Sequence, residues 1–119
     1  MMTEISMSYD RQSDFLEVLF EKPIAGEQAF ELNQNIVLFV NPYTGRPINL
    51  TIIDYKRLLQ MDKIPLDNLK KMPARQQKKV RELILNGPIR NFLEWVNEPR
   101  LKKPYVRILN PQFQELLAA

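Results

Sequence analysis

Two aspartates, Asp10 and Asp14, stand just before the apolar run FLEVLF and are the best candidates in this chain for a carboxylate pair that does chemistry. Two carboxylates held about 5–10 Å apart serve as general acid and base in glycoside hydrolysis. Aspartate also favours turns, because its side chain accepts hydrogen bonds from backbone N–H groups two residues further on. The loop lacks the spacing and the glycine of a calcium-binding EF-hand. We interpret the two residues as the ends of a hairpin turn.

The residue inventory excludes several classes of enzyme. The chain of 119 residues contains no cysteine and no histidine, which excludes thiol catalysis, Ser-His triads, disulfides, zinc fingers and haem ligation by these residues. Its glycines, Gly26, Gly45 and Gly87, form no phosphate-binding loop. We therefore predict a protein without catalytic residues, metal ligands or a cofactor.

Basic residues are concentrated in the second half of the chain. Residues 1 to 60 carry five Lys or Arg against eight Asp or Glu, whereas residues 61 to 119 carry twelve against six, for a net charge of +3 overall. Such a split is typical of chains that bind nucleic acid or an acidic protein partner.

The candidate contacts for such a partner lie on a predicted helix and the turn before it. They are Lys71, Arg75, Lys78 and Lys79. These cations could bind phosphates, releasing counterions. The alternative is a solvated helix face, which is favoured because no aromatic residues for base stacking are interleaved with the cations. Trp95, outside this segment, is interpreted as an edge of the core.

The first half has the patterns of β structure. Residues 5 to 9 alternate apolar and polar side chains, and three further runs, 15 to 20, 36 to 40 and 47 to 53, have strand character, with a short strand around 29 to 32. We predict a small antiparallel β-meander of four to five strands within residues 1 to 60.

From Asp54 the apolar spacing becomes helical, and Asp54 is the expected N-cap of a short helix. Helices over 74 to 86 and 88 to 96 are predicted to form a hairpin, followed by an extended segment over 105 to 109 and a final short helix from Pro111. The predicted fold class is α+β, with a basic helical extension over 61 to 119 that packs on the same core as the meander.

Two of the predicted strands are apolar on both sides, which differs from the alternation of a sheet with one wet face. The helical half can cover one face, so a second copy of the chain is the expected cover for the other, and we predict a homodimer. The candidate assembly face consists of Phe15, Leu19, Val37 and Phe39.

The pattern YDxxxDxLxV at residues 9 to 18, followed by VLFVNPYTGRPINLTIIDYKRLL, resembles a family of short bacterial proteins classed as a domain of unknown function, with the signature YDxxxDxLYI. Gly45 matches the turn glycine of the family, and the run from Leu50 to Asp54 matches its IxILD segment, whereas Glu17, Asn49 and Thr51 depart from it. The resemblance covers about residues 3 to 60. It implies a small β-meander without catalysis and, for some members, a role as the partner of a toxin protein.

These observations favour a non-enzymatic protein-interaction module, antitoxin-like or self-associating, whose basic half binds an acidic surface of a protein partner. The alternative is a nucleic-acid-binding protein that uses the basic second half. The N-terminus MMTEISMSYD has neither a basic nor an apolar signal region, and the longest purely apolar run is Ile36 to Val40. We expect a cytoplasmic protein that does not enter the membrane.

Overall fold

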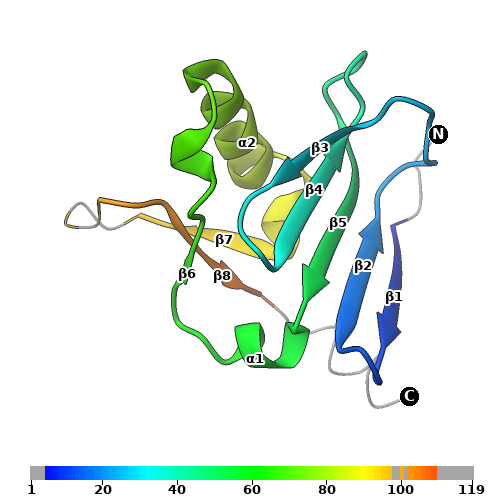
Figure 1. Ribbon diagram of the computed structural model, residues 1–119. Helices are drawn as coiled ribbons and strands as arrows, with labels where there is room; N and C mark the ends of the chain where they lie inside the picture. Colours follow the sequence, from blue (N-terminus) through cyan, green and yellow to red (C-terminus); the bar gives the residue numbers. More distant parts are fainter. Residues whose placement is uncertain (1–4, 98–99, 101, 110–119) are drawn as a thin grey trace.

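The computed structural model describes residues 5–97, 100 and 102–109. It has a five-stranded antiparallel sheet, a three-stranded antiparallel sheet, one long helix and several short helical segments (Figure 1). The predicted α+β fold class is confirmed.

The large sheet is formed by the first half of the chain. Its neighbours run in the order β1-β2-β5-β4-β3, and each pair is antiparallel. The prediction of five strands is therefore confirmed at its upper bound, but a simple meander is wrong, because β2 pairs with β5 instead of β3. Strand β5 is the most buried of the five, and this position gives it a hydrogen-bonded neighbour on both edges. The strands are β1 Ser6–Asp10, β2 Phe15–Leu19, β3 Gln28–Glu31, β4 Ile36–Val40 and β5 Pro47–Ile53.

The second half contains more strand and less helix than predicted. Its small sheet has the order β6-β8-β7, and its main helix is α2. The elements are α1 Tyr55–Leu59, β6 Ile64–Pro65, the 3₁₀ turn η1 Leu69–Lys71, α2 Ala74–Asn86, the 3₁₀ turn η2 Pro88–Asn91, β7 Leu93–Val96 and β8 Tyr105–Ile108.

The predicted helix over 88 to 96 is wrong. The apolar spacing of Ile89, Phe92 and Leu93 does mark buried residues, but they lie on a 3₁₀ turn and the start of a strand. Pairing with β8 sets Leu93 opposite Ile108, so the backbone of β7 finds its hydrogen bonds in a sheet. The extended segment predicted over 105 to 109 is confirmed as β8, and the helix predicted from Pro111 lies outside the described residues.

One hydrophobic core joins the two halves. Side chains of one face of the large sheet, which we call the inner face, pack with those of α2 and the small sheet, and Figure 1 shows these elements on the same side of the large sheet. Hydrogen bonds join the halves as well: the side-chain amide of Asn33 donates to the Pro65 carbonyl at 2.9 Å. The core includes Leu16, Val18, Leu38, Leu50 and Ile52 from the large sheet, and Val80, Leu83, Ile84 and Val106 from the second half.

Asp10 and Asp14 bound the turn between β1 and β2, as predicted. Asp10 accepts a hydrogen bond from the backbone N–H of Gln12 at 3.0 Å, the usual aspartate turn. Asp14 has a left-handed backbone, with φ of 54°, and its carboxylate accepts a hydrogen bond from the Tyr9 hydroxyl at 2.6 Å.

Asp14 also caps α1 from a position 42 residues away in the chain. Both of its carboxylate oxygens lie 3.1 Å from the backbone N–H of Lys56, and its carbonyl accepts from the N–H of Tyr55 at 3.1 Å. Asp54 stands at the N-cap position, as predicted, but its side chain makes no capping hydrogen bond. The helix therefore depends on the hairpin for its cap.

Replacement of Asp14 by alanine is expected to lower the free energy of unfolding by about 2 kcal/mol. The substitution removes a helix cap and hydrogen bonds to a charged group, and it places alanine in a left-handed conformation. Asp14→Asn should lose about half as much, since asparagine tolerates the backbone and keeps one acceptor oxygen. Urea unfolding measures both, with Asp10→Ala as the control; a loss for Asp14→Ala no larger than that of the control would refute the role of Asp14 as a cap.

The Tyr9 hydroxyl provides a second test of this junction. Its ring packs edge-on against Tyr55 at 5.8 Å, and burial together with the hydrogen bond to Asp14 raises the pKa of Tyr9 to about 12. The unfolded chain releases this proton near pH 10. The stability contributed by neutral Tyr9 is therefore present below pH 10 and is lost as the pH rises to 12.

Between pH 9 and pH 12, the melting temperature of the Tyr9→Phe variant should accordingly fall less than that of the unchanged protein. Phenylalanine keeps the ring contact but has no proton to lose. Thermal melts followed by circular dichroism at intervals of pH measure the difference, and parallel curves for the two proteins would contradict it.

Candidate binding surfaces

The face of the large sheet turned away from α2, which we call the outer face, carries an apolar surface with polar residues at its centre. Because strand residues alternate between faces, the predicted assembly residues lie together on it. All four are only partly buried, and β2 and β4 supply them on either side of β5. They are Phe15, Leu19, Val37 and Phe39.

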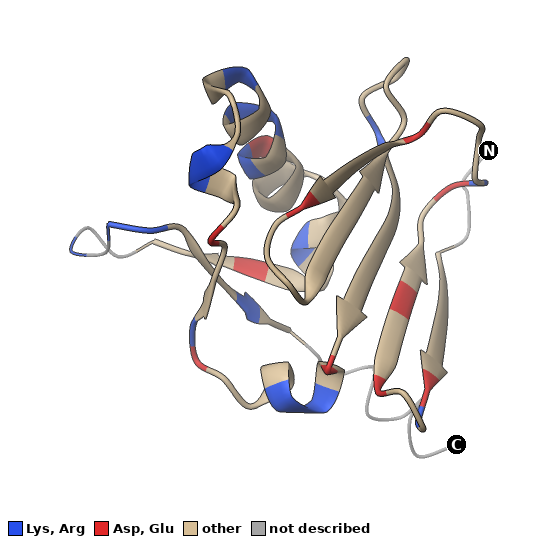
Figure 2. Ribbon diagram, in the orientation of Figure 1, with Lys and Arg blue, Asp and Glu red and all other residues tan. Residues whose placement is uncertain are grey.

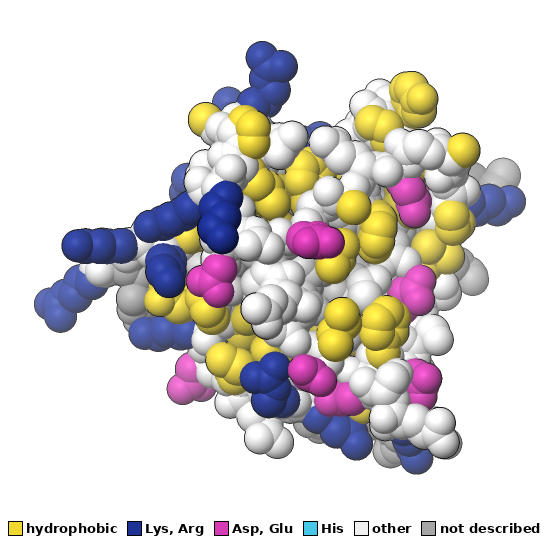
Figure 3. Space-filling view, viewed as in Figure 1, with side chains coloured by type: hydrophobic (Ala, Val, Ile, Leu, Met, Phe, Trp, Pro, Cys, Tyr) yellow, Lys and Arg dark blue, Asp and Glu magenta, His cyan; other side chains and the backbone are white. Residues whose placement is uncertain are grey.

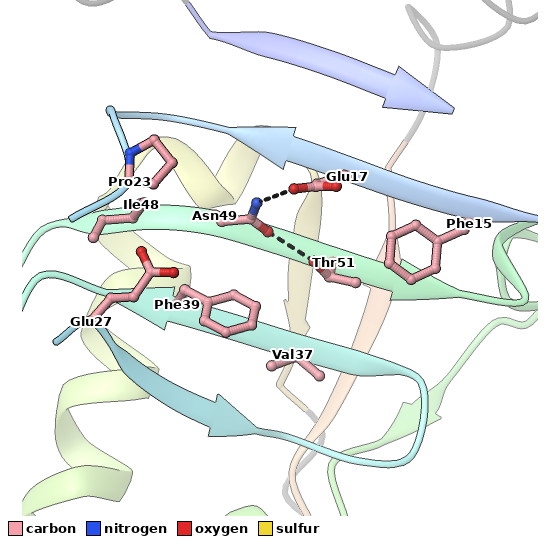
Figure 4. A pocket seen from close by; sticks show the side chains of 9 residues that line it. All are labelled: Phe15, Glu17, Pro23, Glu27, Val37, Phe39, Ile48, Asn49 and Thr51. Atoms are coloured by element: carbon pink, nitrogen blue, oxygen red, sulfur yellow. Dashed lines mark hydrogen bonds between the residues drawn. The ribbon is translucent and has the colours of Figure 1, made fainter. Parts of the chain in front are cut away.

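A short hydrogen-bonded chain crosses the centre of the outer face. The Thr51 hydroxyl donates to Oδ1 of Asn49 at 2.8 Å, and Nδ2 of Asn49 donates to Oε1 of Glu17 at 2.7 Å (Figure 4). Asn49 and Thr51 are each 8% exposed, whereas Glu17 is exposed. The chain therefore fixes the position of a carboxylate on an otherwise apolar surface.

A shallow depression of about 300 Å³ lies over this hydrogen-bonded chain. The connection between β2 and β3 adds Pro23 and Glu27 to its wall. Strand β4 has a bulge between Phe39 and Val40, and Ile48 of β5 also lines the depression. Among the described residues, Oε2 of Glu27 has no hydrogen-bond partner although it is buried. The full lining consists of Phe15, Glu17, Pro23, Glu27, Val37, Phe39, Ile48, Asn49 and Thr51 (Figure 4).

The depression thus presents two carboxylates within an apolar wall. Figure 3 shows hydrophobic side chains interspersed with acidic ones over the strands of the large sheet. A buried oxygen without a partner is unfavourable, and a cation or an N–H donor brought by a ligand would satisfy it. Sequence reasoning identified the apolar residues from alternation but missed Glu27, which lies in a loop.

The predicted basic contacts lie on η1 and α2, in different surroundings. Lys78 lines a groove beside α2, while the Nζ of Lys79 lies against Gly45 in the loop between β4 and β5. Lys71 and Arg75 are exposed but do not line the groove. Of the four predicted contacts, Lys78 is the one that lines the groove.

The groove beside α2, which we call the basic groove, has a volume of about 420 Å³. Its lining residues come from α2 and from segments that precede and follow α2 in the chain. The Arg81 guanidinium lies over the Trp95 ring at 5.8 Å, and Trp95 packs at the edge of the core, as predicted. Figure 2 shows Lys and Arg concentrated on η1, α2 and the connection between β7 and β8. The lining consists of Leu69, Lys70, Gln77, Lys78, Arg81, Trp95, Lys102 and Pro104.

Sequence reasoning missed the juxtaposition of Trp95 with the cations. In the predicted helix hairpin, Trp95 belongs to a second helix, whereas in the structure β7 carries it alongside α2. Lys70 and Lys102 join Lys78 only through the packing of η1 and the connection between β7 and β8. No local pattern could have shown this contact.

Comparison of the chain with protein-family models, with curated proteins and with solved structures found no match. The resemblance over residues 3 to 60 stays a prediction. Over the part of the chain that the structure describes, no helix has the length and apolarity needed to cross a membrane, and no three Asp or Glu side chains come together as a metal site.

Proposed function

We propose that this protein is a non-enzymatic binding module that recognises another protein through the outer face of its large sheet. The bound segment carries an arginine or lysine between apolar side chains. The observation that carries the proposal is the pair of carboxylates, Glu17 and Glu27, in the wall of an apolar depression, with Oε2 of Glu27 buried and lacking a partner among the described residues.

The apolar part of the surface supports a protein partner. Phe15, Val37 and Phe39 remain partly exposed around the depression, although they stand on strands whose opposite side is fully packed. Contiguous apolar surface of this kind is the usual mark of an interaction site. Aromatic side chains at the centre of such a site contribute much of the binding energy when they become buried.

The polar part of the surface supports a cation in the bound segment. Asn49 holds one oxygen of Glu17, so the second oxygen can accept from a partner, and Glu27 offers a buried oxygen. Charge-assisted hydrogen bonds from arginine to carboxylates are about twice as strong as neutral ones and specify geometry. A guanidinium between the two carboxylates would compensate both charges.

The same carboxylates disfavour a symmetric dimer through this face. In a two-fold dimer both partners contribute the same surface, so Glu17 and Glu27 of each copy would meet an acidic surface that has no Lys or Arg in its lining. Like charges at an interface are unfavourable. The homodimer predicted from the sequence therefore becomes the competing outcome of the test.

Three synthetic peptides with the same apolar residues and arginine, glutamine or glutamate at the centre provide the test. We expect the arginine peptide to bind at least about ten-fold more tightly than the glutamine peptide, which corresponds to about 1.4 kcal/mol. The glutamate peptide should bind least. Titration followed by ¹⁵N–¹H NMR should show shifts centred on Phe15, Val37, Phe39 and Thr51.

A matched set of variants identifies the groups responsible. Glu17→Gln combined with Glu27→Gln should reduce the preference for arginine over glutamine to within about two-fold, whereas Glu82→Gln, on the exposed side of α2, should leave it unchanged. Two results would refute the proposal: equal binding of the arginine and glutamate peptides, or a concentration-dependent dimer whose NMR shifts map to the outer face.

A further inference from the structure

The basic groove is a second surface with chemistry opposite to that of the outer face. Its cations come from three segments: Lys70 from η1, Lys78 and Arg81 from α2, and Lys102 from the connection between β7 and β8. No Asp or Glu is among its lining residues. Folding therefore brings like charges together at one place, and their mutual repulsion would be relieved by an anionic ligand.

Two acids near the groove, Asp67 and Glu94, are paired with cations outside its lining. Asp67 pairs with Lys103 at 3.5 Å, and the carboxylate of Glu94 pairs with Arg107. Within the described residues, none of the four groove cations forms an ion pair with a protein carboxylate. Their charge is therefore available to a ligand.

The groove also has a flat surface for stacking. The Arg81 guanidinium lies over the Trp95 ring at 5.8 Å, and Trp95 is held in place by its packing against the core. Nucleic-acid bases stack on aromatic rings and on arginine planes, and such stacking tolerates any base. The combination of cations with a planar side-chain pair distinguishes this groove from a solvated helix face.

We infer that the basic groove binds single-stranded nucleic acid, with the three lysines contacting phosphates and a base lying against the Arg81–Trp95 pair. Its volume of about 420 Å³ lies within the range of pockets that hold ligands of nucleotide size. This inference does not depend on the function proposed for the outer face.

The direct test is binding of a fluorescein-labelled strand of eight thymidines, followed by anisotropy and by the emission of Trp95, the one tryptophan of the chain. Each phosphate contact on a single strand contributes about −0.7 to the slope of log affinity against log salt concentration. Three lysine contacts predict a slope of about −2, or about a 20-fold loss of affinity between 50 and 200 mM salt. Stacking should also quench the Trp95 emission.

A peptide of seven glutamates is the competitor that distinguishes nucleic acid from an acidic protein, because it has about the same charge and no bases. We expect it to bind at least about ten-fold more weakly and to leave the emission of Trp95 unchanged. Equal affinity for the two probes would overturn the inference in favour of an acidic protein partner. Failure of the strand to bind at 50 mM salt would overturn it as well.

Charge-neutral substitutions on one helix separate the groove from general basicity. Lys78→Gln combined with Arg81→Gln should weaken strand binding at least about ten-fold and reduce the salt slope by about a third. Arg75→Gln, which removes a charge from the same helix outside the groove, should change affinity by less than about two-fold. Thermal melts establish that the variants fold, and an effect of Arg75→Gln equal to that of the double variant would overturn the inference.

Discussion

Strand β5 is hydrogen-bonded along both edges and buried on both faces, and most other features of the molecule follow from the need to cover it. Its inner side chains, Leu50 and Ile52, reach the common core, where α2 and the small sheet exclude water. On the outer side, Asn49 and Thr51 are covered by their neighbours on β2 and β4 and by each other's hydrogen bonds. The described part of the second half packs against the inner face, so it leaves the outer face uncovered.

The opposite charges of the two surfaces arise from the same division of the chain. The acidic first half forms the outer face and contributes Glu17 and Glu27, while the basic second half covers the inner face and presents its cations around α2. A charged ligand that fits one surface would therefore be repelled by the other. Two separate binding functions on one small domain are compatible with this arrangement, because their ligands differ in charge.

Local patterns predicted the parts of the structure that depend on neighbouring residues. Alternation identified the strands and the outward side chains Phe15 and Val37, and turn chemistry identified the hairpin at Asp10 and Asp14. The order β2-β5-β4, which brings those side chains together around Asn49, depends on pairing between distant segments. The second role of Asp14, as the cap of α1, could not be predicted for the same reason, since its partner lies 42 residues away.

The basic half shows where spacing alone is ambiguous. Ile89, Phe92 and Leu93 fit the stripe of an amphipathic helix, yet the same residues are buried when a 3₁₀ turn leads into β7. The separation of Lys78 from Lys79 follows from 3.6 residues per helical turn and could have been predicted. The approach of Lys70, Lys102 and Trp95 to Lys78 could not, because it depends on tertiary packing.

The most direct test is a titration of two variants with both probes, the arginine-centred peptide and the strand of eight thymidines. Glu17→Gln with Glu27→Gln should lose the preference for the arginine peptide and keep the affinity for the strand. Lys78→Gln with Arg81→Gln should keep the preference for the arginine peptide and lose the affinity for the strand. Loss of both in either variant, with folding intact, would contradict the claim that the outer face and the basic groove are separate sites.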